Sequence, residues 1–203
     1  IYDLIFDSNQ PWMLSANGTI FTHEYEGIIP GLLKRWYAER KEMQAKLKEA
    51  IKAENKIEEE YWDKRQLVKK INLNSLYGAI LNAGCRFFDN RIGQSTTLTG
   101  RQIAKHMAGK INEVITGEYD HVGKAIIYGD TDSAYFSAYT SLRKEIDKGE
   151  VPWTKETVVQ LYDTIAAEVN STFPQLMLDA FHCPKSRGEV IKAGREIVGS
   201  KSL

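Results

Sequence analysis

The chain has 203 residues, of which 42% are hydrophobic and 27% are charged, and its formal net charge is zero. This length can bury a hydrophobic core, the 15 glycines and 5 prolines are too few for a collagen-like or low-complexity chain, and no apolar run reaches the roughly 18 residues of a membrane span. The two cysteines, Cys85 and Cys183, are far apart and in no zinc-ligand spacing, so the composition predicts a globular protein of one or two domains from a reducing compartment.

Charge is distributed unevenly along the chain, although it sums to zero. The net charge is −4 over residues 1–30, +4 over residues 31–70, +3 over residues 71–117 and −3 over residues 118–203. A polyanion held by the basic middle and a cation held by the acidic part would suit this pattern. Solvated faces of ordinary helices would give the same pattern, so charge alone leaves both interpretations open.

Two long helices are predicted in the first half of the chain. Apolar residues recur at steps of three, four and seven over roughly residues 31–53, which indicates an amphipathic helix with Pro30 at its first turn and Arg40 on its apolar stripe. A second helix is predicted from about residue 58 to residue 81, after a charged stretch at residues 54–60. Two long helices joined by a short polar connection form an antiparallel hairpin.

The second half of the chain mixes predicted helices with β-structure. Helical periodicity covers residues 98–115 and 157–170, and residues 139–155 are expected to form an exposed connection. Two β-rich runs surround a Gly-Asp-Thr-Asp centre within residues 124–137, which predicts a tight β-hairpin with an acidic turn. A further strand is predicted over residues 189–198.

The turn of the predicted β-hairpin carries two carboxylates, Asp130 and Asp132. If both residues are extended, their side chains leave the same face of the ribbon, with Cα atoms about 6 to 7 Å apart. Mg²⁺ binds hard oxygen ligands, commonly one or two protein carboxylates with substrate phosphate oxygens, so the pair could supply the protein's share of a magnesium site. An Asp-rich turn that caps its own backbone is the alternative. A calcium-binding EF-hand loop is excluded, because Ala134 and Tyr135 occupy its fifth and sixth positions.

One face of the second predicted helix carries residues that suit a nucleotide. Steps of about 100° per residue place Lys70, Asn74 and Tyr77 within about 60° of arc. A lysine can meet a phosphate as a point charge, and a tyrosine can stack on a sugar or base edge. Gly78 lacks a side chain beside them, at a helix cost of about 1 kcal/mol relative to alanine, which indicates close approach by another group. A solvated lysine beside a packed tyrosine is the structural alternative.

The helix face and the acidic turn lie within two distinctive sequence patterns. Lys-x₃-Asn-Ser-x-Tyr-Gly at residues 70–78 is followed, some fifty residues on, by Tyr-Gly-Asp-Thr-Asp-Ser at residues 128–133. In this order they resemble the second and third motifs of the family B DNA-dependent DNA polymerases. The run at residues 27–41 is similar to the first fingers helix of that family, and the details are most similar to the replicative polymerases of T-even-type phages.

The resemblance implies an α+β fold that combines two parts of a polymerase. Residues 28–81 would form the fingers, a long antiparallel helical hairpin. Residues 1–27 would be a lead-in segment of the palm, and residues 82–203 a further part of the palm. This palm part would contain an antiparallel sheet with packing helices and the Asp-Thr-Asp hairpin.

The resemblance also implies which residues would bind the incoming dNTP. Arg40 and Lys70 would hold its triphosphate, Arg40 through a planar fork and Lys70 as a compact charge. Asn74 and Tyr77 would border its sugar and the nascent base pair, beside Gly78.

The same resemblance assigns the acidic turn to catalysis. Asp130 and Asp132 would help to hold two Mg²⁺ ions, which Mn²⁺ could replace, one lowering the pKa of the primer 3′-hydroxyl and the other stabilising the leaving pyrophosphate. No protein nucleophile is required. The implied activity is that of a DNA-directed DNA polymerase, a nucleotidyltransferase that binds primer–template DNA and dNTPs during DNA replication.

Some features depart from the family pattern. Gln44 stands where Lys or Arg is common, and the family's first motif, which supplies another metal carboxylate, has no counterpart after Asp3 or Asp7. An exonuclease, a thumb and the palm's Lys-x-Tyr element are also missing, and the chain begins with isoleucine. We therefore expect an internal fragment of a longer cytoplasmic polymerase, in the host cytoplasm if the source is viral. The isolated fragment is expected to be inactive, with replisome partners bound by parts outside this chain.

Other functional classes remain open from the residues alone. A nucleotide-sugar transferase also uses an Asp-x-Asp metal site, but it gives no role to the helix face at residues 70–78. A non-catalytic nucleic-acid-binding helical module would use the Asp-Thr-Asp turn only structurally. A structural subunit of a replisome would bind DNA with steep salt dependence yet ignore dNTPs.

Overall fold

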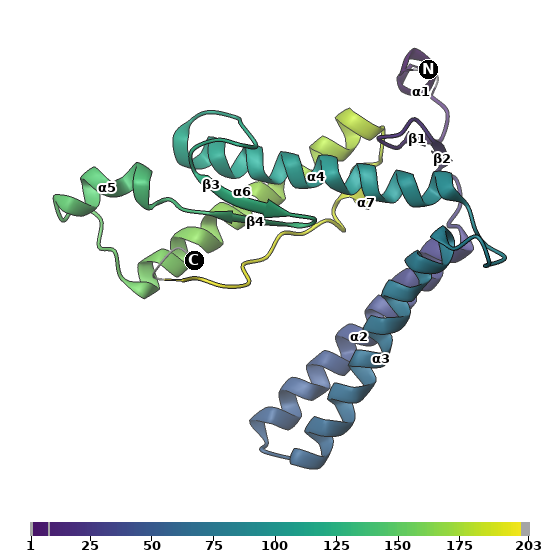
Figure 1. Cartoon of the computed structure of the whole chain (residues 1–203), viewed down its shortest axis with the longest axis horizontal. Coiled ribbons are helices and arrows are strands. Elements are labelled where there is room, and N and C mark those ends of the chain that lie inside the picture. Colours follow the sequence, from purple (N-terminus) through teal and green to yellow (C-terminus); the bar gives the residue numbers. More distant parts are fainter. Residues whose placement is uncertain (1, 8, 200–203) are drawn as a thin grey trace. The chain divides into compact units, whose positions relative to one another are not determined.

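The computed structural model describes residues 2–7 and 9–199, and the chain forms two compact units. One unit contains residues 22–94, and the other contains residues 1–21 together with residues 95–203. The described residues combine long helices with two two-stranded sheets, so the fold is α+β, as predicted (Figure 1). No helix within this described part is both long and apolar enough to cross a lipid bilayer.

The unit of residues 22–94 is built around a helical hairpin. α2 (Ile28–Lys52) and α3 (Lys56–Leu81) lie side by side and antiparallel (Figure 1). Pro30 lies in the first turn of α2, where a missing N–H leaves no helical hydrogen bond unmade. Asn55 caps α3, because its side-chain oxygen accepts a hydrogen bond from the backbone N–H of Glu58 at 3.3 Å. Both helices and their pairing confirm the sequence prediction.

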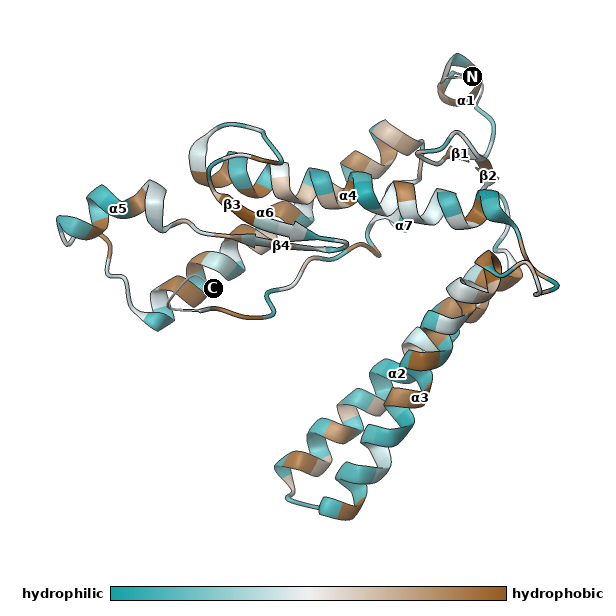
Figure 2. Cartoon of the chain, in the orientation of Figure 1, coloured by the Kyte–Doolittle hydropathy of each residue, from teal (hydrophilic) through white to brown (hydrophobic). Residues whose placement is uncertain are grey.

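Polar contacts contribute much of the pairing between α2 and α3. Ala50 and Ile80 are the buried residues of these two helices. Lys69 of α3 forms an ion pair with Glu39 of α2. Hydrophilic and hydrophobic residues alternate along both helices, and most side chains are exposed (Figure 2). The hairpin therefore exposes charged groups together with large apolar side chains such as Ile57, Val68 and Ile71.

The other unit contains most of the remaining elements, and β2 and α4 cross the boundary between the units. In chain order, these elements are α1 (Tyr2–Phe6), β1 (Trp12–Leu14), β2 (Ile20–Thr22), α4 (Asn90–Thr116), β3 (Ile126–Asp130), β4 (Ser133–Phe136), α5 (Tyr139–Asp147), α6 (Lys155–Phe181) and α7 (Lys185–Gly188). β1 pairs with β2, and β3 pairs with β4 in an antiparallel hairpin. In the turn after β1, the hydroxyl of buried Ser15 donates to the hydroxyl oxygen of buried Ser95 in α4 at 3.2 Å. This hydrogen bond joins the first sheet to α4.

The hydrophobic core of this unit lies between α4 and α6. Its buried members are Ile111 of α4 and Ile165, Val169 and Phe173 of α6. Ile126 of β3 and Phe136 of β4 pack against this cluster, and the Phe136 ring lies 5.0 Å from the ring of Tyr162. Burial of each large apolar side chain contributes about 1.5 to 3 kcal/mol. The core thus holds one face of the β3–β4 hairpin.

The exposed connection predicted at residues 139–155 is wrong in its first part, which forms α5. The ring centres of Tyr139 and Trp153 lie 5.5 Å apart in an edge-to-face arrangement. This contact packs the start of α5 against the segment that follows the helix. α4 and α6 are also longer than predicted, and α6 continues through Pro174. The added C-terminal part of α6 packs against α7, where Gly188 lies beside Pro174 and Met177.

The strand predicted over residues 189–198 is also wrong. The segment has no regular secondary structure, yet side chains of α6 hold it in place. Asn170 donates to the carbonyl of Ala193 at 2.8 Å and accepts from its N–H at 2.7 Å. Arg195 forms an ion pair with Asp163 at 2.7 Å. A side-chain amide therefore makes the two hydrogen bonds that a neighbouring strand would have made at Ala193.

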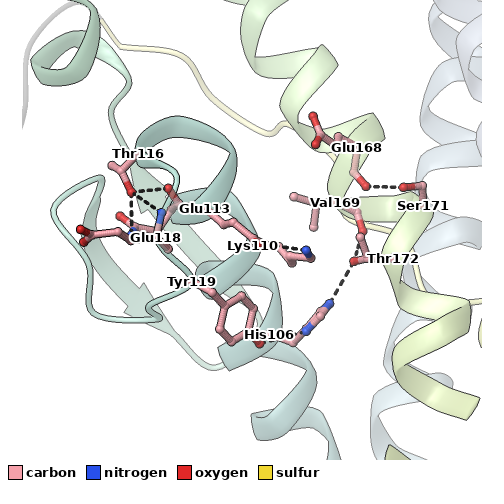
Figure 3. Close-up of polar contacts among 11 residues, drawn as sticks. His106, Lys110, Glu113, Thr116, Glu118, Tyr119, Glu168, Val169, Ser171 and Thr172 are labelled. Atoms are coloured by element: carbon pink, nitrogen blue, oxygen red, sulfur yellow. Dashed lines mark hydrogen bonds and ion pairs between the residues drawn. The ribbon is translucent and has the colours of Figure 1, made fainter. Parts of the chain in front are cut away.

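A histidine links α4, the loop after α4 and α6 (Figure 3). The Nδ1 atom of His106 lies 3.0 Å from the Tyr119 hydroxyl, and its Nε2 atom lies 2.9 Å from the Thr172 hydroxyl. Thr172 donates its hydroxyl proton to the carbonyl of Val169 at 2.7 Å, so it accepts from Nε2–H of His106. Nδ1 of the neutral ring then accepts from Tyr119. Burial, followed by the nearby Lys110, lowers the pKa of His106 from its ordinary value.

Acidification is expected to destabilise the unit that contains His106. Because its pKa is lowered, the folded chain binds the proton less readily than the unfolded chain, and the weaker opposing effect of Glu113 does not reverse this. The stability that neutral His106 contributes is present above its unfolded pKa of about 6.5 and is lost as the pH falls through the folded value.

Thermal unfolding at pH 7.5 and pH 5.5 would measure this loss. His106→Gln is expected to reduce the difference between the two melting temperatures, whereas His121→Gln, at an exposed position of the same unit, serves as the control. If His106→Gln left the difference between the two melting temperatures unchanged, His106 would not be the source of the pH dependence.

Candidate functional site

The face of α3 that the sequence predicts to bind a nucleotide is intact and accessible. α3 continues without interruption through Lys70, Asn74, Tyr77 and Gly78, and all four residues are exposed. A Cβ atom at Gly78 would meet no atom within 4 Å other than its chain neighbours and the nearby backbone of its own helix. Packing within the chain therefore does not explain this glycine, and the bare helix surface stays open to another molecule.

Arg40 lies on the same side of the hairpin as this face. It is half-buried on α2, and its Nε atom donates to the side-chain oxygen of Gln66 at 3.4 Å. Gln66 is four residues before Lys70 on α3, and residues four apart are neighbours on one helix face. The structure therefore brings Arg40 to the ridge that carries Lys70, Asn74 and Tyr77.

Lys69, beside Lys70 in the sequence, has a different role. Its ammonium group pairs with Glu39 and lies 5.7 Å from the centre of the Trp36 ring. The hydrogen bond from Lys69 lowers the pKa of Glu39. Lys70 points about 100° further around α3, and within the described residues it has no ion-pair partner. Of the two adjacent lysines, Lys70 is the one whose charge remains available to a ligand.

The sequence analysis did not predict the contacts of Gln66 and Lys69 with α2. Both residues are polar, so they do not contribute to the apolar stripe from which helix pairing was predicted. The spacing of residues 62, 66, 69 and 73 places them on one side of α3, and this spacing could have indicated the contacts. All four residues are partly buried in the structure.

The acidic turn is formed as predicted, with a different local geometry for its carboxylates. Asp130 is the last residue of β3 and pairs with Ser133, which leaves Thr131 and Asp132 as a two-residue turn. Thr131 has φ 48°, in the left-handed region that a β-branched residue rarely adopts. The alternation of side chains along an extended strand therefore does not apply, and the turn sets the direction of each carboxylate.

Both carboxylates are exposed at the tip of the hairpin. The hydroxyl of Thr131 donates to Asp130 Oδ1 at 3.0 Å, and the hydroxyl of Ser133 donates to the Asp130 carbonyl at 3.1 Å. Within the chain's described part, no lysine or arginine forms an ion pair with Asp130 or Asp132.

The donor set of this turn fits Mg²⁺ as a partial site. Carboxylate oxygens are hard ligands, and Mg²⁺ is commonly bound through one or two protein carboxylates together with water and substrate phosphates. Among residues 2–7 and 9–199, no group of three or more His, Cys, Asp or Glu side chains could hold a metal ion. Asp130 and Asp132 are therefore suited to supply two ligands, and not a complete protein cage.

The predicted residues fall into two sets, one in each unit. Arg40, Lys70, Asn74, Tyr77 and Gly78 belong to the unit of residues 22–94. Asp130 and Asp132 belong to the other unit. Within its own unit, each set is accessible and is carried by regular secondary structure or by a tight turn.

Comparison with known proteins identifies the family. The sequence model of DNA polymerase family B matches residues 8–181. The chain is 35% identical over 113 residues to a DNA polymerase of Paramecium bursaria Chlorella virus NY2A, which covers 55% of this chain and 12% of the relative. It is 27% identical over 191 residues to a DNA polymerase of Red sea bream iridovirus, which covers 90% of this chain and 18% of the relative.

A phage protein is also similar. The chain is 38% identical over 74 residues to the DNA-directed DNA polymerase of Escherichia phage RB69, which covers 36% of this chain and 8% of the relative. The chain thus spans less than a fifth of the length of each of these three relatives. Because the family model covers most of its residues, including both motifs, the chain belongs to DNA polymerase family B.

Proposed function

We propose that this chain binds the incoming dNTP and supplies two metal-binding carboxylates in template-directed DNA synthesis. The observation that carries the proposal is the exposed ridge of α3 on which Lys70, Asn74 and Tyr77 are aligned. The ridge combines a positive charge, an amide and an aromatic ring, which are groups that can bind the phosphates, sugar and base of a nucleoside triphosphate. Membership of the polymerase family supports this use of the ridge.

Each residue of the ridge has a chemical role in this proposal. Lys70 binds a phosphate oxygen as a compact charge, and Arg40 turns its guanidinium from Gln66 toward the triphosphate. Tyr77 packs against the sugar or base, and Asn74 donates or accepts a hydrogen bond beside it. Gly78 leaves room for the ligand to approach the helix backbone.

Asp130 and Asp132 hold Mg²⁺ in the proposed reaction, and Mn²⁺ can replace it. Two bound ions would supply activation of the primer 3′-hydroxyl and stabilisation of the leaving pyrophosphate. The primer 3′-hydroxyl releases its proton to water, and the bond from its oxygen to the α-phosphorus forms as the bond from that phosphorus to pyrophosphate breaks. No side chain of this chain becomes covalently linked to the nucleotide.

The partners that follow are primer–template DNA and dNTPs, with replisome proteins bound by other parts of a polymerase in the cytoplasm. The 203-residue chain by itself is expected to show no primer extension. Two carboxylates give an incomplete metal site, and the described residues provide no third ligand beside them.

Nucleotide titrations followed by NMR would test the proposal. In the presence of Mg²⁺, dATP is expected to shift the amide signals of residues 70–78, whereas UDP-glucose leaves them unchanged. A nucleotide-sugar transferase would respond to UDP-glucose, and a purely structural hairpin would respond to neither ligand. Either of those results would overturn the proposed nucleotide site.

A further inference from the structure

A buried amide near the end of α4 holds the base of the acidic hairpin. Asn112 is 1% exposed. Its Nδ2 atom donates to the carbonyl of Glu118 at 2.8 Å and to the hydroxyl of Thr116 at 3.0 Å. Its Oδ1 atom accepts from the backbone N–H of Ala125 at 3.0 Å. Exchanging the two ends of the amide would oppose like groups at Glu118 and Ala125, so these partners fix its orientation.

Ala125 lies at the base of the hairpin, next to the start of β3 and the end of β4. It directly precedes β3 and is 2% exposed, with its N–H held by Asn112. Its carbonyl accepts from the N–H of Ser137, the residue that follows β4, at 2.9 Å. Asn112 of α4 is thus hydrogen-bonded to Ala125, and Ala125 is in turn hydrogen-bonded to the residue that follows β4.

Gly123 shows how closely the backbone packs on this amide. A Cβ atom at Gly123 would lie 2.2 to 2.4 Å from three atoms of the Asn112 side chain, which is closer than such atoms can approach. The Gly123 carbonyl also accepts from the N–H of Ile126 at 3.0 Å, at the start of β3. The segment before β3 therefore has little freedom to move relative to Asn112.

The register of β3 depends on its first residues. Ile126 pairs with Phe136 but Tyr128 pairs with Tyr135, so β3 has a bulge at Ile127. Bulges re-aim the residues that follow them, and a shift by one residue exchanges the two faces of a strand. The direction of the turn beyond Tyr128 is therefore set by where β3 begins.

We propose that Asn112 is a positioning residue for Asp130 and Asp132. Its amide fixes where β3 starts at Ala125, and the strand carries that placement to the two carboxylates at the tip. Asn112 touches neither the metal nor the nucleotide in this proposal. The inference rests on the proposed metal-binding function of the acidic turn.

Two variants separate positioning from general stability. Asn112→Leu removes all three hydrogen bonds of the side chain, including the bond to Ala125. Thr116→Val removes only a hydroxyl at the end of α4 and leaves the bond between Asn112 and Ala125 in place. Mn²⁺ affinity would be measured from the broadening of amide signals of residues 129–133 in the folded 203-residue chain.

Asn112→Leu is expected to weaken Mn²⁺ binding about tenfold, which is typical for residues that orient metal ligands indirectly. It is also expected to shift the amide signals of β3. Thr116→Val should leave both readouts at the wild-type values. A purely structural role would lower the melting temperature of these variants and leave the affinity of the folded chain unchanged, which would overturn the inference.

Gly123→Ala decides the question where Asn112→Leu does not fold. Its added methyl group pushes on the same amide while every hydrogen-bonding group remains, and it should move the same β3 signals. Unchanged signals would overturn the inference. If Mn²⁺ fails to broaden residues 129–133 even in the wild type, the proposed metal site fails, while the β3 shifts still test the link from Asn112 to the hairpin.

Discussion

Asp132→Asn is expected to lower primer extension by a full-length polymerase carrying this segment about a thousandfold or more. Asparagine keeps the size of the side chain but removes the charge that attracts a divalent cation. Metal assistance contributes several kcal/mol to such reactions, and each 1.36 kcal/mol corresponds to a factor of ten in rate. DNA affinity should fall only modestly, because cationic groups, and not carboxylates, bind the phosphate backbone.

The control for this prediction is Asp179→Asn. Asp179 is an exposed carboxylate of the same unit, on α6, with a hydrogen bond from Gln175 at 2.7 Å. Single-turnover extension and DNA-binding anisotropy should both stay near wild type in this variant. Primer extension by Asp132→Asn within tenfold of wild type would show that the acidic turn is not part of the metal site.

Lys70→Ala is expected to weaken use of the incoming dNTP about 10- to 100-fold, mainly through a higher KM. Hydrogen bonds to charged groups contribute about 1.5 to 3 kcal/mol, which corresponds to this range. Lys70 is exposed on α3 and, in the described residues, has no competing acidic partner, so its charge is available to a triphosphate. Steady-state extension at varied dNTP concentration would measure the effect.

Lys64→Ala provides the matched control on the same helix. Lys64 is also exposed, but it pairs with Glu60 and points about 120° away from Lys70 around α3. Its removal should leave the dNTP dependence unchanged. If both alanine variants raised KM equally, the effect would reflect general charge loss and not binding at the predicted face.

The helical hairpin was predictable from helical periodicity and a short polar connection, although these signals do not account for all of its pairing. Apolar residues recur at helical spacing in both helices, but Leu67, Val68 and Ile71 of α3 are exposed, and polar contacts such as that of Lys69 with Glu39 also join the helices. The same periodicity placed Lys70, Asn74 and Tyr77 on one face. The prediction was incomplete where structure depends on contacts between distant residues. The ring of Tyr139 at the start of α5 contacts the ring of Trp153, and neither residue by itself indicates a helix in the sequence.

Side-chain hydrogen bonds account for the other differences. The segment around Ala193 has the composition of a strand, but the amide of Asn170 pairs with its backbone in place of another strand. Arg40 was predicted as a ligand of phosphate, whereas its contact with Gln66 could not be predicted from an apolar stripe. Asn112 shows the same limit, because a buried amide gives no periodic signal.

The acidic turn was predicted from composition, and its geometry was not. Two β-rich runs around Gly-Asp-Thr-Asp correctly indicated a hairpin. The alternation argument assumed extended residues throughout, but Thr131 adopts a left-handed conformation at the tip. A threonine at such a position is unfavourable on local grounds, so a prediction from propensity would not choose it.

Binding of Mn²⁺ to the 203-residue chain is the most direct test of the central claim that Asp130 and Asp132 form a divalent-metal site. Amide signals in the NMR spectrum would be followed at low, increasing Mn²⁺ concentrations in the wild type and in Asp132→Asn. We expect selective broadening of residues 129–133 in the wild type and its loss in the variant. Broadening centred elsewhere, or equal broadening in both proteins, would contradict the claim.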